Sequence, residues 1–463
     1  MRLQSKKLNQ ISYPPIILAV FLASMVYWVY LALTSSMIIV FDAVGYESFG
    51  RMIQTQGWIP YFTSGPNREP FYPFLISLSM SLTQLTGIAY VKFMAFFGVI
   101  ILFLTQLLTY QILRLLNVRL GICVFILSYL ALSPALNNAA FSLFSEIAAF
   151  PVVLGIILVS HLLWEAIANN RKLLAFFYSI FVGLLLMLAT FCKASFECIT
   201  PVFLVIFIVT ILLREKKRTV IALFCLIVAA TSYYAPITAY KWLNLHYNGN
   251  FVITDRGPWA LYGSTARRME PLTPKRLAEA LSFAPGEGVC ESFFGAQECQ
   301  FWSFSKSDEL GFAKLDELNK EHLSSQKINS TLIHLSAQKA MQNPFQYALL
   351  TLIEGLKMFF WESTKVGFVT YPQTVGKIYN IKLFNNGLRF VAFLFSFIGV
   401  LSLWRGNLKP DNPSLCFLMG LLIFLYILSF SFFFILTRYA LPMAPLYLIC
   451  FGLWLDQKLA HKK

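Results

Sequence analysis

The stretch LNQISYPPIILAVFLASMVYWVYLALTSSMIIVF, residues 8–41, contains no charged side chain between Lys7 and Asp42. A helix needs roughly 20 mostly apolar residues to cross a bilayer, and a helix satisfies its own backbone hydrogen bonds in lipid. The stretch therefore predicts a first membrane-spanning helix. It is too long for the apolar part of a cleavable signal peptide, so we expect it to be retained as an anchor.

Further uncharged runs of the same kind follow along the chain. They lie between Lys92 and Arg114, Arg119 and Glu146, Glu146 and Glu165, Lys172 and Lys193, Glu197 and Arg214, Arg218 and Lys241, Arg389 and Arg405, Asp411 and Arg438, and Arg438 and Asp456. Together the runs predict about ten spanning helices and an all-α polytopic membrane protein. Two shorter segments, Phe71–Val91 and Tyr347–Trp361, are ambiguous by length.

The composition agrees with lipid as the surrounding solvent. Hydrophobic residues make up 57% of the 463 residues and charged residues only 13%, whereas soluble domains carry roughly 25% charged residues. The net charge of +15 comes from Lys and Arg in short loops between apolar runs, where they set the orientation in the membrane. We therefore expect a lipid bilayer as partner and no nucleic acid.

The positions of the basic residues predict which loops face the cytoplasm. About ten crossings place every basic cluster, and both termini, on the cytoplasmic side. The clusters are Arg2/Lys6/Lys7, Arg114/Arg119, Arg171/Lys172, Arg214/Lys216/Lys217/Arg218, Arg405/Lys409 and Lys458/Lys462/Lys463. If 71–91 crossed, the cluster at 214–218 would move outside, so 71–91 and 347–361 are predicted to lie on, or dip into, the outer face.

Two polar regions then face outward, residues 42–73 and a longer segment from Lys241. The predicted organisation is an N-terminal membrane module (1–240), a small extracytoplasmic loop domain with helical stretches (241–345) and a C-terminal membrane module (346–463). Cys290 and Cys299 lie together in the loop domain and can form a disulfide if it faces an oxidising compartment. The other cysteines lie in or beside apolar runs, where thiols are usually inert.

Four ionisable residues are predicted to meet at the outer membrane boundary. Asp42 ends the first helix, Glu146 begins the fourth, Lys193 ends the fifth and Arg438 begins the tenth. Two acids and two bases at one level suit an anionic lipid headgroup and a proton transfer. Charged helix ends at the interface are also ordinary, and this alternative stays open.

The motifs around these residues resemble those of the GT-C glycosyltransferases. The relatives are bacterial proteins similar to protein O-mannosyltransferases and to the lipid A aminoarabinose transferase, of the glycosyltransferase family 39 type. The matching stretches are FDAVGY at 41–46, GW at 57–58, REPFYP at 68–73, SE at 145–146 after SP at 133–134, Lys193, YKWLN at 240–244, GNFV at 249–252 and RYALP at 438–442. They span most of the chain in the family's order.

The resemblance implies an inverting transfer of a sugar from a polyprenyl phosphate to an acceptor hydroxyl on the extracytoplasmic face. Asp42 would be the general base, and Glu146 would orient the acceptor or a cation. The donor phosphate would be bound by Arg438 and Lys193, with Arg68 and Arg256 as weaker candidates. Tyr46, Tyr72 and Tyr439 are substrate-contact candidates, although Tyr46 equally fits an interfacial aromatic.

One departure from the family's motif bears on whether the site binds a metal ion. Many members have a second acid beside the loop aspartate or two residues after it, where this chain has Ala43 and Val44, and Glu47 is the nearest acid. A divalent ion usually needs several oxygen ligands, so we expect a site without metal or other cofactor.

Other functions remain open from the sequence. They are another enzyme of polyprenyl-linked glycans, such as a polymerase or ligase, and a transporter or flippase of lipid-linked sugars. Transporters tend to show internal repeats, and none is visible here. The resemblance favours a location in the bacterial inner membrane, and the acceptor (lipid, glycan or protein) stays open.

Overall fold

The spanning helices form a bundle, as the uncharged runs predict. The computed structural model describes residues 13–66, 68–362, 368–406, 408 and 412–460. Within these residues, nine helices are long and apolar enough to cross a membrane. They are α1 (Pro15–Thr34), α5 (Tyr90–Leu115), α8 (Glu146–Ala168), α9 (Lys172–Cys192), α10 (Phe196–Arg214), α11 (Thr219–Asn248), α20 (Lys382–Trp404), α21 (Pro413–Ser431) and α22 (Ala444–Ala460), the last entered through the 3-10 turn η4 (Thr437–Met443).

A tenth crossing is bent. Helix α6 (Leu120–Leu132) meets α7 (Pro134–Ala140) at 52°, and together they pass the same test of length and hydropathy. Pro134 cannot donate the backbone hydrogen bond that a continuous helix needs, and the Ser133 hydroxyl accepts from the Leu136 N–H to start α7. The prediction of about ten spans in an all-α polytopic membrane protein is confirmed.

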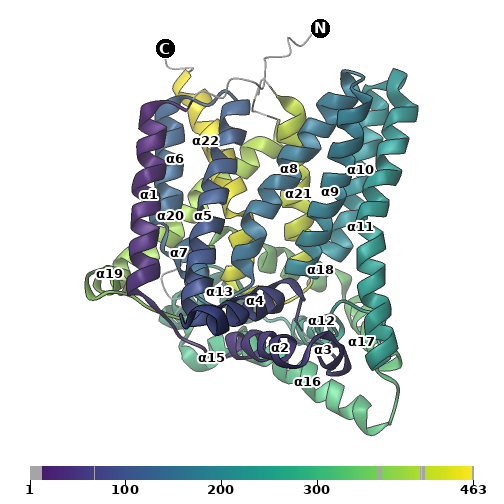
Figure 1. The fold of residues 1–463 in the computed structure, drawn as a ribbon. Helices are drawn as coiled ribbons and strands as arrows, with labels where there is room; N and C mark the ends of the chain where they lie inside the picture. The colour runs from purple at the N-terminus through teal and green to yellow at the C-terminus, as the bar shows by residue number, and fades with distance from the viewer. Residues whose placement is uncertain (1–12, 67, 363–367, 407, 409–411, 461–463) are drawn as a thin grey trace.

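The order of the spans returns the chain to the end where it began. Helix α1 begins and α22 ends at the same end of the bundle (Figure 1). The turns after α5, α8 and α10 lie at that end and carry Arg119, Arg171 and the 3-10 turn η2 (Lys216–Arg218). The predicted basic residues Arg2, Lys6, Lys7, Lys409, Lys462 and Lys463 lie outside the described residues.

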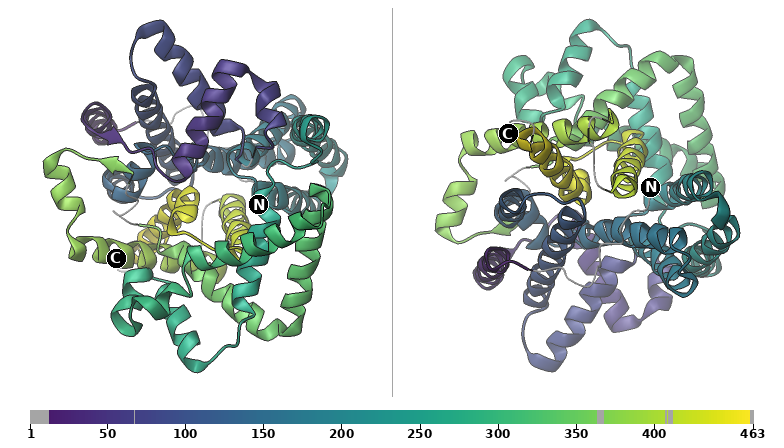
Figure 2. Two further views of the ribbon diagram at one scale, coloured as in Figure 1. Left: turned by 90° about the horizontal axis from the view of Figure 1, so that it is seen from below. Right: turned by 90° about the horizontal axis from the view of Figure 1, so that it is seen from above.

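Short helices cover the opposite end of the bundle, and we call them the cap (Figures 1 and 2). The cap consists of α2 (Asp42–Gln56), α3 (Trp58–Thr63), α4 (Phe71–Thr86), α12 (Arg256–Arg268), α13 (Pro274–Phe283), α14 (Glu287–Phe294), α15 (Ala296–Gln300), α16 (Phe304–Lys320), α17 (Ser325–Gln342), α18 (Pro344–Leu356) and the 3-10 turn η3 (Lys357–Phe359). The ambiguous segments 71–91 and 347–361 fall mainly on α4 and on α18 with η3, none of which is among the spans.

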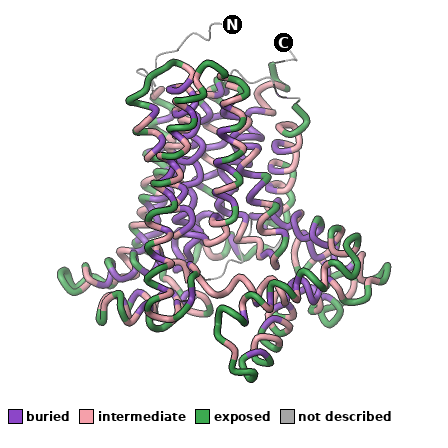
Figure 3. Tube along the Cα trace, turned by 90° about the vertical axis from the view of Figure 1, so that its right-hand side faces the viewer, coloured by how far each residue is buried: buried purple, intermediate pink, exposed green. Residues whose placement is uncertain are grey.

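Burial distinguishes the inside of the bundle from its rim. Buried residues follow the inner faces of the spans and exposed residues follow the periphery, whereas the cap contains both (Figure 3). Large apolar side chains such as Leu22 of α1 and Leu213 of α10 are nevertheless exposed on the rim. A bundle that is apolar on both its inner and outer faces fits a lipid environment. The cap has its own smaller apolar clusters, one of which contains the disulfide between Cys290 and Cys299.

A two-stranded pairing anchors the segment that follows α1. Strand β1 (Ser36–Met37) pairs antiparallel with β2 (Val369–Thr370), with Ser36 opposite Thr370 and Met37 opposite Val369. The short helix α19 (Gln373–Tyr379) then leads from β2 towards α20. The pairing matters because it fixes the chain a few residues before Asp42.

Candidate active site

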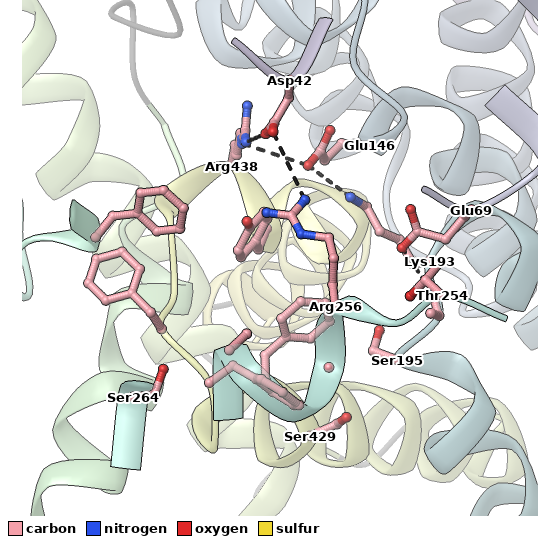
Figure 4. A pocket seen from close by; sticks show the side chains of 18 of the residues that line it. Asp42, Glu69, Glu146, Lys193, Ser195, Thr254, Arg256, Ser264, Ser429 and Arg438 are labelled. Atoms are coloured by element: carbon pink, nitrogen blue, oxygen red, sulfur yellow. Dashed lines mark hydrogen bonds and ion pairs between the residues drawn. The ribbon is translucent and has the colours of Figure 1, made fainter. Parts of the chain in front are cut away.

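A cavity of about 320 Å³ lies where the bundle meets the cap. Its walls come from α2, α8, the turn between α9 and α10, α12, α16, the end of α21 and η4, and Figure 4 shows many of its side chains. The charged residues that line it are Asp42, Glu69, Glu146, Lys193, Glu197, Arg256, Asp308 and Arg438. The four residues predicted to meet at the outer boundary, Asp42, Glu146, Lys193 and Arg438, therefore share one cavity.

Asp42 is surrounded by arginines. Arg68 Nη2 donates to Asp42 Oδ1 at 2.7 Å, Arg256 Nη1 lies 4.0 Å from the same oxygen, and Arg438 Nη2 donates to Oδ2. Burial raises the pKa of Asp42, but Arg438, Arg68 and Arg256 together bring it below its ordinary value. The carboxylate is therefore anionic in this cavity, with both of its oxygens bound by arginines.

The position of Asp42 differs from the prediction in one respect. Asp42 is the first residue of α2, and α1 ends at Thr34. The residue before it, Phe41, has φ of +51°, a left-handed conformation that is uncommon for a bulky side chain. The prediction that Asp42 ends the first helix is thus wrong, because the chain leaves α1, pairs through β1 and turns sharply at Phe41. An aspartate at a helix N-terminus also has its charge stabilised by the helix dipole.

Glu146 and Lys193 form a buried ion pair beside Asp42. Lys193 Nζ donates to Glu146 Oε1 at 2.9 Å, and Arg438 Nε lies 3.8 Å from the same oxygen. Burial lowers the pKa of Lys193, but Glu146, together with Tyr46, Glu69 and Tyr439, outweighs this effect and holds the pKa above its ordinary value, so the lysine stays charged. Glu146 Oε2 is buried without a hydrogen-bond partner within the described part of the chain, which leaves one acceptor oxygen free for a ligand.

The predicted substrate-contact tyrosines lie in different places. Tyr46 and Tyr439 line the cavity, and the Tyr46 hydroxyl is 2.8 Å from the Ser145 hydroxyl. Tyr72 does not line it: its ring packs edge-on against Tyr46, and its hydroxyl donates to the Ser142 carbonyl. Tyr72 therefore packs against Tyr46 outside the cavity lining.

The predicted phosphate-binding residues also divide into two groups. Lys193, Arg256 and Arg438 line the cavity, whereas Arg68 is not in its lining and approaches Asp42 from the α3–α4 side. The Arg68 guanidinium lies 5.4 Å from the centre of the Tyr46 ring. Arg68 is thus placed to hold Asp42 and Tyr46 in position, and three cations remain to face a ligand.

Three acids in the lining were not predicted as site residues. Glu69 follows Arg68 in the motif REPFYP, and its Oε1 accepts from the Ala194 N–H at 3.1 Å. Glu197 pairs with Lys241 at 2.6 Å. Asp308 comes from α16, far along the chain. The motif points to Glu69, but no local pattern distinguishes Asp308 from the other acids of the polar segment.

The arrangement suits an anionic ligand that can replace one carboxylate. Arg256 and Arg438 both face Asp42 from the cavity wall, and a phosphate offers the same kind of oxygen to a guanidinium. Within the described residues, no group of three or more His, Cys, Asp or Glu side chains is placed to hold a metal ion. The chain matches no protein-family model and no curated protein.

Proposed function

We propose that this chain is a membrane glycosyltransferase of the GT-C type, which moves a sugar from a polyprenyl-phosphate donor to an acceptor hydroxyl with inversion. The observation that carries the proposal is the placement of Asp42 between Arg256 and Arg438 in a cavity at the end of an apolar bundle. The resemblance supports it as well, because motif residues far apart in the sequence line this one cavity.

The donor phosphate would bind by exchange with Asp42. Its oxygens would accept hydrogen bonds from Arg438 and Arg256, the two arginines that are directed at the Asp42 carboxylate in the structure. Losing these two partners raises the pKa of Asp42, since their charges keep it low. Donor binding thereby makes the Asp42 carboxylate a stronger base, which can take a proton from the acceptor.

The transfer then balances as a single displacement. The acceptor oxygen forms a bond to the anomeric carbon while the bond from that carbon to the phosphate oxygen breaks. The acceptor proton goes to Asp42, and the bonding electrons leave with the polyprenyl phosphate. Arg438 and Lys193 stabilise the negative charge that develops on the phosphate, as preorganised cations do in active sites that exclude water.

The free oxygen of Glu146 has a place in this scheme. Oε1 is paired with Lys193, so Oε2 remains to accept a hydrogen bond from a sugar or acceptor hydroxyl.

Aromatic side chains at the end of α21 and in the segment after it line the cavity as well, namely Phe430, Phe433 and Phe434. They suit the first apolar units of a prenyl chain that enters from the bilayer.

We further propose that the cap is extracytoplasmic and the chain termini are cytoplasmic, in a bacterial inner membrane. Basic residues in the turns at the end opposite the cap support this orientation through the positive-inside rule. The disulfide between Cys290 and Cys299 in the cap supports it independently, because disulfides persist in oxidising compartments.

The test measures sugar transfer by the purified protein. Wild type and Asp42→Asn are incubated with radiolabelled polyprenyl-phosphate sugars and membrane acceptors, with and without chelator. We expect Asp42→Asn to lower the rate by about 100-fold or more, the usual effect of losing a general base. Glu47→Gln is the matched control, because Glu47 lies on the same helix, pairs with Arg51 and is not in the cavity lining.

Each result decides between the open functions. Transfer that survives Glu47→Gln and fails in folded Asp42→Asn supports the enzyme class and the base. Equal transfer by Asp42→Asn and wild type would remove Asp42 from the mechanism. Absence of donor consumption across the panel, with donor movement in proteoliposomes, would favour a flippase instead.

A further inference from the structure

Asp308 differs from the other carboxylates of the cavity. Four of the five lining acids have a partner: Asp42 pairs with arginines, Glu69 with a backbone N–H, Glu146 with Lys193 and Glu197 with Lys241. Asp308 forms no hydrogen bond or ion pair within the described residues, although it lines the cavity and is half-buried. The charges of Arg256 and Asp42 act on Asp308, but no donor in the described part of the chain contacts its carboxylate. Burying a carboxylate without a hydrogen bond is costly, so a ligand group is expected to supply one.

Two hydroxyls near Asp308 are also unsatisfied. Ser264 of α12 and Ser307 of α16 line the cavity and are 1% and 3% exposed. The Oγ atoms of both are buried without a hydrogen-bond partner among the described residues. Figure 4 shows Ser264 well apart from Asp42 and Arg438. The cavity therefore has a second polar region, made of oxygen atoms alone.

The second region is held in a fixed geometry by close helix packing. A Cβ at Gly263 of α12 would lie 2.0 Å from the Ser307 carbonyl and 2.9 Å from the Gly311 N. On the same two helices, Trp259 stacks on Phe312 with ring centres 4.2 Å apart. The backbones of α12 and α16 thus approach as closely as glycine allows, which places Ser264, Ser307 and Asp308 on one rigid wall.

The chemistry of this wall selects a particular class of group. The carboxylate accepts hydrogen bonds and repels anions, and the two hydroxyls can accept or donate, so this wall has no cation, in contrast to the wall formed by Arg256 and Arg438. Aromatic side chains border the region, among them Trp259 and Phe304. The apolar rings suit a sugar face or an aliphatic chain next to hydroxyl groups.

We propose that Asp308, with Ser264 and Ser307, is the acceptor subsite and selects an uncharged, hydroxyl-bearing amphiphile such as a glycolipid headgroup. The cavity is then divided by charge, with the donor phosphate at the arginine wall and the acceptor hydroxyls at the Asp308 wall. The assignment of this ligand as the acceptor rests on the proposed transfer reaction, whereas the binding preference itself does not.

The experiment measures binding of a defined probe. Tritiated octyl β-glucoside is titrated below its micellar concentration onto the full chain in amphipol, and octyl β-glucuronide is its anionic counterpart. We expect wild type to prefer the glucoside. Asp308→Asn should weaken glucoside binding about tenfold, as expected for losing hydrogen bonds to a charged group, and should reduce the preference over the glucuronide. Asp308→Glu should restore part of both.

Matched variants separate this subsite from the rest of the protein. Glu309→Gln changes the next residue, whose side chain is 65% exposed and pairs with Lys306, and we expect it to bind like wild type. Ser307→Ala should weaken glucoside binding less than Asp308→Asn. An Asp308→Asn variant with wild-type affinity and preference, or a wild type that does not bind the glucoside, would overturn the proposal.

Undecaprenyl phosphate binding distinguishes the two proposals. We expect Asp308→Asn to bind it as wild type does, since its phosphate occupies the arginine wall. A wild type that binds the glucoside but not undecaprenyl phosphate would contradict the proposed transferase and leave the Asp308 subsite supported. Loss of undecaprenyl phosphate binding in Asp308→Asn would contradict the division of the cavity into two regions.

Discussion

A buried charge cluster in the cap offers the sharpest test of how the site is held. Glu354 of α18 is 3% exposed and accepts from Arg267 at 3.1 Å and from Lys357 at 2.7 Å. The same Glu354 oxygen that meets Lys357 accepts from the Ile435 N–H at 2.9 Å. One carboxylate therefore ties α12, η3 and the segment that leads into Arg438 together.

Replacing Glu354 by alanine leaves buried cations without their counter-charge. Burial raises the pKa of Glu354, but Lys357, Arg267 and Arg268 bring it down from 4.5 to about 2. Burial also lowers the pKa of the partner Lys357 to about 8, although Glu354 opposes this shift, so the shift of the carboxyl group alone does not give the stability of the pair. Breaking a buried pair by removing one partner typically costs about 3–5 kcal/mol, and we expect a loss of about 3 kcal/mol here. This stability is present above pH 4.5 and is lost as the pH falls towards 2.

The assay is thermal unfolding of the purified protein in detergent, followed by the loss of soluble protein. At about 1 °C per kcal/mol for a chain of 463 residues, a loss of about 3 kcal/mol lowers the midpoint by about 3 °C. Glu354→Gln keeps an acceptor for Ile435 but removes the charge, so we expect it to be nearly as unstable as Glu354→Ala.

The control is Glu309→Ala, which breaks an ion pair with an exposed carboxylate, and such pairs contribute little. If Glu354→Ala melted no lower than Glu309→Ala, the cluster would not stabilise the cap. If Glu354→Gln alone melted like wild type, the hydrogen bond to Ile435 and not the charge would be the stabilising contact.

Three further predictions concern the cavity wall and the cap. Burial raises the pKa of Asp308 to about 6; because the carboxylate loses its charge below that pH, glucoside binding should weaken from pH 7 to pH 5, and a flat profile would count against the subsite. Gly263→Ala should force α12 and α16 apart, lowering stability by about 1–3 kcal/mol and weakening glucoside binding. Gly288→Ala, in another cap helix with open space around its Cβ and outside the cavity lining, should do neither. Replacing Cys290 and Cys299 by serine removes a disulfide between cysteines nine residues apart in the sequence. This change should lower the unfolding free energy by about 2.5 kcal/mol, and an unchanged melting temperature would show that the disulfide does not stabilise the protein.

The bundle was predictable from the sequence because its signal is local. An uncharged run such as 8–41 must span or be buried, and the basic turns fix the parity of the crossings. The details at the cap end were less predictable. Helix α11 continues to Asn248, past the boundary expected at 240, and Asp42 begins α2 instead of ending α1. These features depend on tertiary contacts such as the pairing of β1 with β2, which no local pattern contains.

The distinction between local signals and tertiary contacts also applies to the cavity. It explains why Asp308 could not be predicted from the sequence. Asp42, Glu146, Lys193 and Arg438 stand at the ends of apolar runs, so the topology alone brings them to one level. Asp308 belongs to an amphipathic helix of the cap, where acids usually face water. Its role depends on the glycine contact that presses α16 against α12 and turns one acid of that helix into the cavity. A membrane boundary therefore marks Lys193 and Arg438, which we assign to the phosphate, whereas Arg256 and the surface that we assign to the acceptor come from helices of the cap. On this view, changes in α16 should alter which acceptor is used without altering the donor.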